Sequence, residues 1–189
     1  MKILLTLFII FISSLVFADD ISDFQIEGMS VGDSLLDYFS KNEIEKKRQF
    51  YTLGGEYMKD YSRFYKEDNN KTYDRVVLFF KSDDTKYIIK GISGRNYYVD
   101  DINKCYKIQK IISNDIKIVA DSAEMIVDKK KKHFRFPNSY VKSIYFLLKD
   151  SDITVSCYDY SIKDTTSRDR LSVIMRTEEL NIYLRSTMK

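Results

Sequence analysis

The sequence predicts an α+β fold in which an antiparallel β-sheet, formed by a hairpin and a meander, packs with one long helix and with shorter N- and C-terminal helices. Runs of β-branched and aromatic residues occur in pairs separated by short acidic turns, which is typical of antiparallel strands. Between these pairs lies a segment with apolar residues every three or four positions, which indicates a helix with one buried face. Capping patterns near both ends of the chain predict the shorter helices.

Residues 1–18 have the composition of a cleavable signal peptide. Lys2 supplies a positive start, residues 3–16 are mostly apolar, and Ala18 places a small residue directly before the expected cleavage site. This apolar run is shorter than the ~20 residues that a membrane-spanning helix needs, although an uncleaved anchor is the alternative. Lipid attachment would need a cysteine where Asp19 stands. We therefore expect residues 19–189 to form a single α+β domain, periplasmic or secreted, with no transmembrane segment after cleavage.

Length and charge exclude little beyond one class of partner. The chain has 189 residues, with 31 Lys and Arg, 28 Asp and Glu, and a formal net charge of +3. This length suits one domain with a core large enough to fold without a metal ion. So small a net charge gives no general attraction to nucleic acid, and no nucleic-acid partner is expected.

Two capping patterns open the folded part of the chain. Ser30 and Asp33 have capping-box spacing, and apolar residues follow at every fourth position, which predicts a helix that begins near Val31. Ser40 and Glu43 repeat the pattern and predict a second, short and polar helix.

The next segments include one undecided region and one hairpin. Residues 50–72 have aromatic residues at helical spacing, but the same residues suit irregular strands, so both structures remain open. Residues 75–81 and 86–98 are strand-like and are joined by an acidic turn, which predicts a hairpin. Gly91 and Gly94 in its second strand predict a bulge or a bend.

A long helix follows the hairpin. Asp100 or Asp101 caps it, and its apolar residues step by three or four positions, which marks one buried face. These residues are Ile102, Cys105, Ile108, Ile112, Ile116 and Val119.

The last part of the chain predicts a three-stranded meander and a closing helix. A polar link through Lys132 leads to strands over residues 141–149, 153–158 and 170–176. Thr177 then caps a helix with two acidic residues in its first turn, where they interact favourably with the helix dipole. Its inward-facing residues are Leu180, Tyr183 and Leu184.

The two cysteines form a candidate disulfide. Cys105 lies on the apolar stripe of the long helix, and Cys157 alternates with Ile153 and Val155 on the expected buried face of a strand. An exported protein can keep such a bond oxidised. The alternative is two separate buried thiols that pack as small apolar groups.

No residue pattern indicates catalysis. The only histidine, His133, lies in a lysine-rich connector and is interpreted as a solvated loop residue. A single histidine does not supply the converging groups of a zinc site or a catalytic triad. Paired carboxylates such as Asp83 and Asp84 are explained as turn residues. No catalytic residue, metal ligand or cofactor is predicted.

A basic run around that histidine is a candidate surface for an anionic partner. Its charges could contact phospholipid head groups, lipopolysaccharide or a wall polymer. The alternative is a solvated loop whose charge is partly offset by acidic residues just upstream. The candidate anionic-surface patch consists of Lys129, Lys130, Lys131, Lys132 and Arg135.

Four motifs spread over most of the chain carry a resemblance. They are IEGMSVGDSLLDYFS at 26–40, YIIKGISG at 87–94, DDINKCYKIQKII at 100–112 and TVSCYDYS at 154–161. Together they resemble a family of exported proteins of unknown activity from AT-rich marine bacteria, which implies export and a single α+β domain. The stretch GMSxxxSLLDYF is also similar to the opening helix of small lipoproteins that assist outer-membrane β-barrel assembly, but the lipid-bearing cysteine is missing here.

These observations favour an exported periplasmic protein that acts as a non-catalytic binding or interaction module. A cell-envelope hydrolase, or an accessory factor in envelope assembly, is the alternative. The expected partner is an envelope protein or an anionic envelope surface. A deep pocket lined by converging polar side chains would favour the hydrolase, whereas an exposed apolar patch or an open sheet edge would favour the interaction module.

Overall fold

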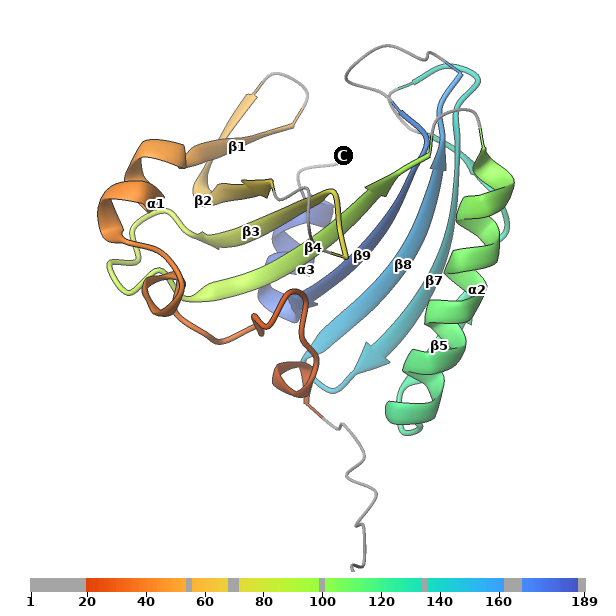
Figure 1. Ribbon diagram of the computed structural model, residues 1–189, viewed down its shortest axis with the longest axis horizontal. Helices are drawn as coiled ribbons and strands as arrows, with labels where there is room; N and C mark the ends of the chain where they lie inside the picture. The colour runs from red at the N-terminus through yellow and green to blue at the C-terminus, as the bar shows by residue number, and fades with distance from the viewer. Residues whose placement is uncertain are drawn as a thin grey trace, which may run out of the picture.

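The computed structural model describes residues 20–53, 56–67, 72–98, 101–133, 136–161 and 168–186. The expected signal peptide, residues 1–18, lies outside this part of the chain and stays a prediction. Within the described residues, an antiparallel sheet of nine strands packs with three α-helices, so the predicted α+β class is confirmed (Figure 1).

All strand pairs in the sheet are antiparallel. The strands follow the order β1-β2-β3-β4-β9-β8-β7-β5, and β6 also pairs with β7. Their bounds are β1 Gln49–Leu53, β2 Glu56–Glu67, β3 Arg75–Lys81, β4 Ile89–Tyr97, β5 Glu124–Val127, β6 Lys131–Lys132, β7 Tyr140–Leu148, β8 Ser151–Asp159 and β9 Arg170–Thr177.

The predicted hairpin is β3–β4 and the predicted meander is β7–β8–β9, and both are confirmed. The pairing of β4 with β9 joins them into one sheet. Residues 50–72, left open by the sequence, contribute β1 and β2. The polar link before β7 is not a simple connector, because β5 and β6 both pair with β7. Every residue of β5 is exposed, so the strand lacks the alternation of apolar and polar residues that would reveal it.

The N-terminal region contains one of the two predicted helices. α1 (Lys41–Lys47) begins after Ser40, whose hydroxyl accepts a hydrogen bond from the backbone N–H of Glu43 at 3.2 Å. Within described residues 20–53, no α-helix begins near Val31; the predicted stretch instead contains a single 3₁₀ turn, Leu35–Asp37, capped by Ser34. Gly32 has a φ of +100°, which takes the chain out of the helical conformation, and its N–H donates to the carbonyl of Ile89 at 2.9 Å.

α2 (Ile102–Val119) is the predicted long helix. The Asp101 side chain accepts from the N–H of Lys104 at 3.0 Å and so caps it. The buried line follows Cys105, Gln109, Ser113 and Ile116 and then continues to Ala120. The prediction that Val119 belongs to this line is wrong, because the side chain of Val119 is 44% exposed.

α3 (Glu178–Ser186) closes the described chain as predicted. The hydroxyl of Thr177 accepts from the N–H of Leu180 at 3.3 Å, and Leu180 and Leu184 are buried. Gly91 in β4 lets the helix approach the sheet closely, because a Cβ there would lie 2.6 Å from Cδ2 of Leu180. The predicted bulge is present beside this glycine, where the β3–β4 register shifts between Phe79 and Phe80.

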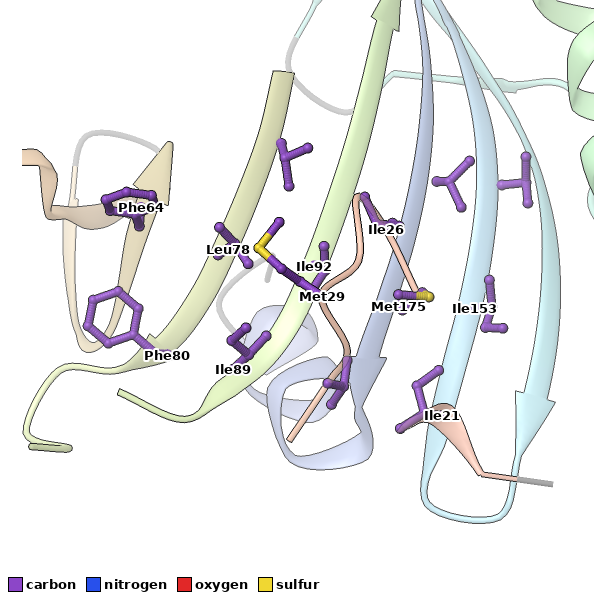
Figure 2. Close-up of a cluster of buried hydrophobic side chains, with 14 of the residues drawn as sticks. Ile21, Ile26, Met29, Phe64, Leu78, Phe80, Ile89, Ile92, Ile153 and Met175 are labelled. Atoms are coloured by element: carbon purple, nitrogen blue, oxygen red, sulfur yellow. The ribbon is translucent and has the colours of Figure 1, made fainter. Parts of the chain in front are cut away.

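The two sides of the sheet carry separate apolar clusters. On one side, here called the core face, α2 and the N-terminal segment (residues 20–40) pack against β3, β4, β9 and β8. Figure 2 shows Ile21, Ile26 and Met29 of the N-terminal segment lying over Ile92 and Met175 of the sheet. The opposite side, here called the α3 face, has a smaller cluster made by Tyr61, Val77, Phe79, Leu180 and Leu184.

A disulfide joins α2 to the core face, as predicted. Cys105 and Cys157 are bonded, with a Cα–Cα distance of 6.0 Å, and both are completely buried. The helix is further tied to the sheet by Gln109, whose Nε2 donates to the carbonyls of Lys142 and Val155, each at 2.8 Å. The long helix is therefore fixed to strands β7 and β8 by both covalent and polar contacts.

Candidate functional site

Three arginines meet on the α3 face, at the end of the sheet away from α3. Arg75 of β3 lies directly across from Arg95 of β4. Arg170 of β9 lies across from Tyr97, two residues along β4 from Arg95. Cross-strand partners place their side chains on the same face of a sheet, so the three guanidinium groups share this face. We call Arg75, Arg95 and Arg170 the arginine cluster.

Tyrosine rings flank the arginine cluster. The Cζ of Arg75 lies 5.6 Å from the ring centre of Tyr65 and 5.9 Å from that of Tyr97. The Cζ of Arg170 lies 4.6 Å from the ring centre of Tyr158 and 5.4 Å from that of Tyr160. A cation beside an aromatic ring is attracted to its electron-rich face, so these contacts offset part of the cost of gathering like charges.

Arg95 has the least favourable surroundings in the cluster. Burial lowers the pKa of Arg95, and the charge of Arg170 lowers it further. The Nε atoms of Arg95 and Arg170 are both buried without a hydrogen-bond partner. Neither side chain forms an ion pair with a carboxylate among the described residues. Since like charges directly across a sheet repel each other, the cluster lowers the stability of the folded protein as it stands.

An aromatic cluster adjoins Arg170 and contains the only histidine. The ring of His133 lies 5.0 Å from Phe136, 6.0 Å from Tyr158 and 5.4 Å from Tyr160, measured between ring centres. Its Nδ1 accepts from the backbone N–H of Phe136 at 3.4 Å. The interpretation of His133 as a solvated loop residue is therefore wrong, because the imidazole is half-buried against aromatic rings at the end of β8.

Some lysines of the predicted anionic-surface patch form ion pairs in the structure and others are exposed. Lys130 pairs with Asp159 at 2.7 Å and Lys131 pairs with Asp128 at 2.8 Å, so these two charges are balanced locally. Lys129 and Lys132 are exposed. Arg135 lies outside the described residues. Binding of an anionic partner by Lys129, Lys130, Lys131, Lys132 and Arg135 stays a prediction.

A polar hollow lies beside α3 at the other end of the α3 face. It has a volume of about 430 Å³ and is lined by Lys59, Asp60, Tyr61, Lys81, Ser82, Asp83, Glu179 and Tyr183. Lys81 pairs with Glu179 at 2.6 Å, which lowers the pKa of Glu179 and raises that of Lys81. Burial and the nearby Glu179 raise the pKa of Tyr61 to about 12. The hollow therefore holds a charge-balanced pair and a neutral phenol at neutral pH.

The described residues contain no group of three or more His, Cys, Asp or Glu side chains that could hold a metal ion. In the same part of the chain, no helix is both long enough and apolar enough to cross a membrane. Comparison of the chain with protein-family models, curated proteins and solved structures found no match.

The arginine cluster was missed by sequence reasoning. Arg75 and Arg95 are separated by a hairpin, and Arg170 lies far along the chain, so the three become neighbours only through the β3–β4–β9 pairing. The available signal was weak: each arginine lies near a strand end, and a tyrosine follows Arg95 two residues later.

Proposed function

We propose that this protein is an exported, periplasmic and non-catalytic binding module, and that its arginine cluster holds the phosphate or carboxylate group of an anionic ligand. Arg95 carries this proposal. Its buried Nε lacks a hydrogen-bond partner, and its side chain lies directly opposite that of Arg75 on the neighbouring strand. A bound anion would supply the missing negative charge and accept the unused N–H groups.

The chemistry of arginine supports an anionic ligand. Guanidinium groups donate in a planar fork that matches the oxygens of phosphate and carboxylate groups. Partial burial weakens the competition from water for these hydrogen bonds. The neighbouring rings of Tyr97 and Tyr158 would give the ligand flat apolar walls.

The rest of the fold supports a binding module over a cell-envelope hydrolase. The polar hollow beside α3 holds a lysine and a glutamate that neutralise each other. The α2 and β5 side of the molecule instead exposes large apolar residues, including Ile118 and Val127. The disulfide supports an oxidising compartment. Export itself is tested by intact-mass analysis of the native envelope fraction, which should show a chain that begins at Asp19 and not at Met1.

Ligand binding can be tested with inorganic phosphate as the probe. A titration followed by backbone amide NMR should shift the signals of β4 and β9 around Arg95 and Arg170, and phosphate should raise the melting temperature. Arg95→Met should weaken phosphate binding by at least about tenfold, because it removes a charged fork and keeps a side chain of similar length. Arg185→Gln, on the exposed surface of α3, is the matched control and should bind as the wild type does.

The same variant separates a binding role from a structural role. If the arginine cluster exists for ligand binding, Arg95→Met should leave the ligand-free protein as stable as the wild type or more stable, since it removes a poorly paired charge. A large loss of stability without any effect on phosphate binding would show that Arg95 serves the fold, and the proposal would fail.

A further inference from the structure

α2 presents an outward line of residues with an unusual mixture of properties. Lys104, Lys107, Ile111 and Ile118 follow one another at steps of three, four and seven, so they lie along one side of the helix. This side is opposite to the buried line through Cys105 and Gln109. The side chains of Ile111 and Ile118 are 54% and 71% exposed, which is unfavourable for two isoleucines in water.

Basic residues outnumber acidic residues in α2. α2 carries four lysines and a single aspartate, Asp115. Within the described residues, none of the four lysines forms an ion pair, whereas Lys81, Lys130 and Lys131 elsewhere on the surface all do. We call the outward residues Lys104, Lys107, Lys110, Ile111, Asp115, Lys117 and Ile118 the α2 surface; Asp115 offsets one of its four positive charges, so the surface stays basic.

The exposed apolar residues continue from α2 into β5. Met125 and Val127 are 39% and 55% exposed. They pair with Phe146 and Ile144 of β7, so they point to the core face, where α2 also packs. Figure 1 shows α2 and β5 together at the side of the sheet farthest from β1. The C-terminal end of α2 and the neighbouring strand therefore present apolar groups on the same side.

We propose that the α2 surface docks reversibly on an anionic phospholipid bilayer. The lysines would attract the negative headgroups, and Ile111 and Ile118 would enter the boundary between the headgroups and the acyl chains, as the apolar residues of interfacial helices do. A second copy of this chain is a poor occupant, because the lysines of two such helices would repel each other. This docking surface is separate from the arginine cluster, which lies on the opposite face of the sheet.

Vesicle sedimentation tests the proposal with the full chain. The protein should bind vesicles of equimolar phosphatidylglycerol and phosphatidylcholine, should not bind phosphatidylcholine alone, and should be released as NaCl rises from about 50 to about 300 mM. The variant Ile111→Ser/Ile118→Ser should reduce vesicle binding by about tenfold. Ile182→Ser on α3 is the matched control, since Ile182 is 60% exposed and lies outside the surface. All three positions are exposed, so the variants should keep the wild-type circular dichroism spectrum.

Three results would overturn the proposal: absence of vesicle binding, equal binding to both lipid compositions, or an equal loss in the control variant. Self-association in analytical ultracentrifugation that Ile111→Ser/Ile118→Ser abolishes, without vesicle binding, would assign the surface to a second copy and also reject the lipid. Ile111→Ser/Ile118→Ser should bind inorganic phosphate as the wild type does, because both positions lie outside the arginine cluster. Failure of phosphate binding and failure of membrane docking are therefore distinguishable.

Discussion

Removal of the disulfide between Cys105 and Cys157 should cost the protein a large part of its stability. The bond closes a separation of 52 residues and links the long helix to the sheet. In the chain-entropy model, a loop of this length lowers the conformational entropy of the unfolded chain enough to stabilise the folded state by about 4 kcal/mol. A protein of this size should then lose about 10 °C in melting temperature.

Urea denaturation followed by circular dichroism measures this effect in three samples: the oxidised wild type, the reduced wild type, and Cys105→Ala/Cys157→Ala. Both cysteines are completely buried, so the alanine variant also loses some packing around the missing sulfur atoms. The reduced wild type keeps both sulfur atoms and isolates the effect of the covalent link. Both altered samples should also show a steeper dependence on urea, because their unfolded chains expose more surface.

Two outcomes would contradict this stabilisation by the disulfide. If the reduced wild type loses less than about 1 kcal/mol relative to the oxidised protein, the bond does not restrict the unfolded chain as the model requires. If only the alanine variant is destabilised, packing of the sulfur atoms, and not the link, supplies the stability.

Three further changes test the packing and the electrostatics of the fold. Gly91→Ala should lower the free energy of unfolding by about 1–3 kcal/mol in urea, because its Cβ would lie 2.6 Å from Leu180, and an unchanged midpoint would contradict the close approach. Asp152→Asn should cost about 3 kcal/mol in the same assay, since the buried Asp152 accepts from Arg176 at 2.8 and 3.0 Å, and a neutral effect would show that the pair contributes little. Glu179→Gln should cost less than about 1 kcal/mol at pH 7, because the side chain is 49% exposed. Pairing with Lys81 lowers the pKa of Glu179 in the folded protein from 4.5. The carboxylate therefore adds its full contribution to stability above pH 4.5 and loses it as the pH falls through the folded pKa. The stabilities of the wild type and of Glu179→Gln should converge in acid, and a difference that persists there would reject the assignment.

The sequence correctly predicts those helices and strands whose ends are set by local residues, such as a turn or a capping side chain. β3 has the predicted bounds because a long apolar and aromatic run ends at an acidic turn, and α2 begins at its capping aspartate. The helix expected near Val31 failed because Gly32 takes a positive φ and its N–H pairs with the backbone of β4. β5 was missed because its residues are all exposed and show no alternation.

The candidate binding site was less accessible to sequence reasoning than the fold. The disulfide could be predicted because each cysteine lies in an apolar pattern of its own helix or strand. An arginine near a strand end is ordinary by itself, and only the pairing of β4 with β9 brings Arg95 beside Arg170. No local sequence pattern predicts that pairing, because several strands could in principle lie beside β9 in the sheet.

The central position of β9 sets the order in which this sheet can be completed. β9 lies between β4 and β8, although it is the last strand of the described part of the chain. Until residues 170–177 have been synthesised, the strands from β1 to β4 and those from β5 to β8 have no strand between them, and β4 and β8 each present an unpaired edge. Contacts between residues so distant in the chain form slowly, and unpaired edges invite association with other chains. A chain truncated before residue 170 should therefore leave the edges of β4 and β8 unpaired and be prone to aggregation.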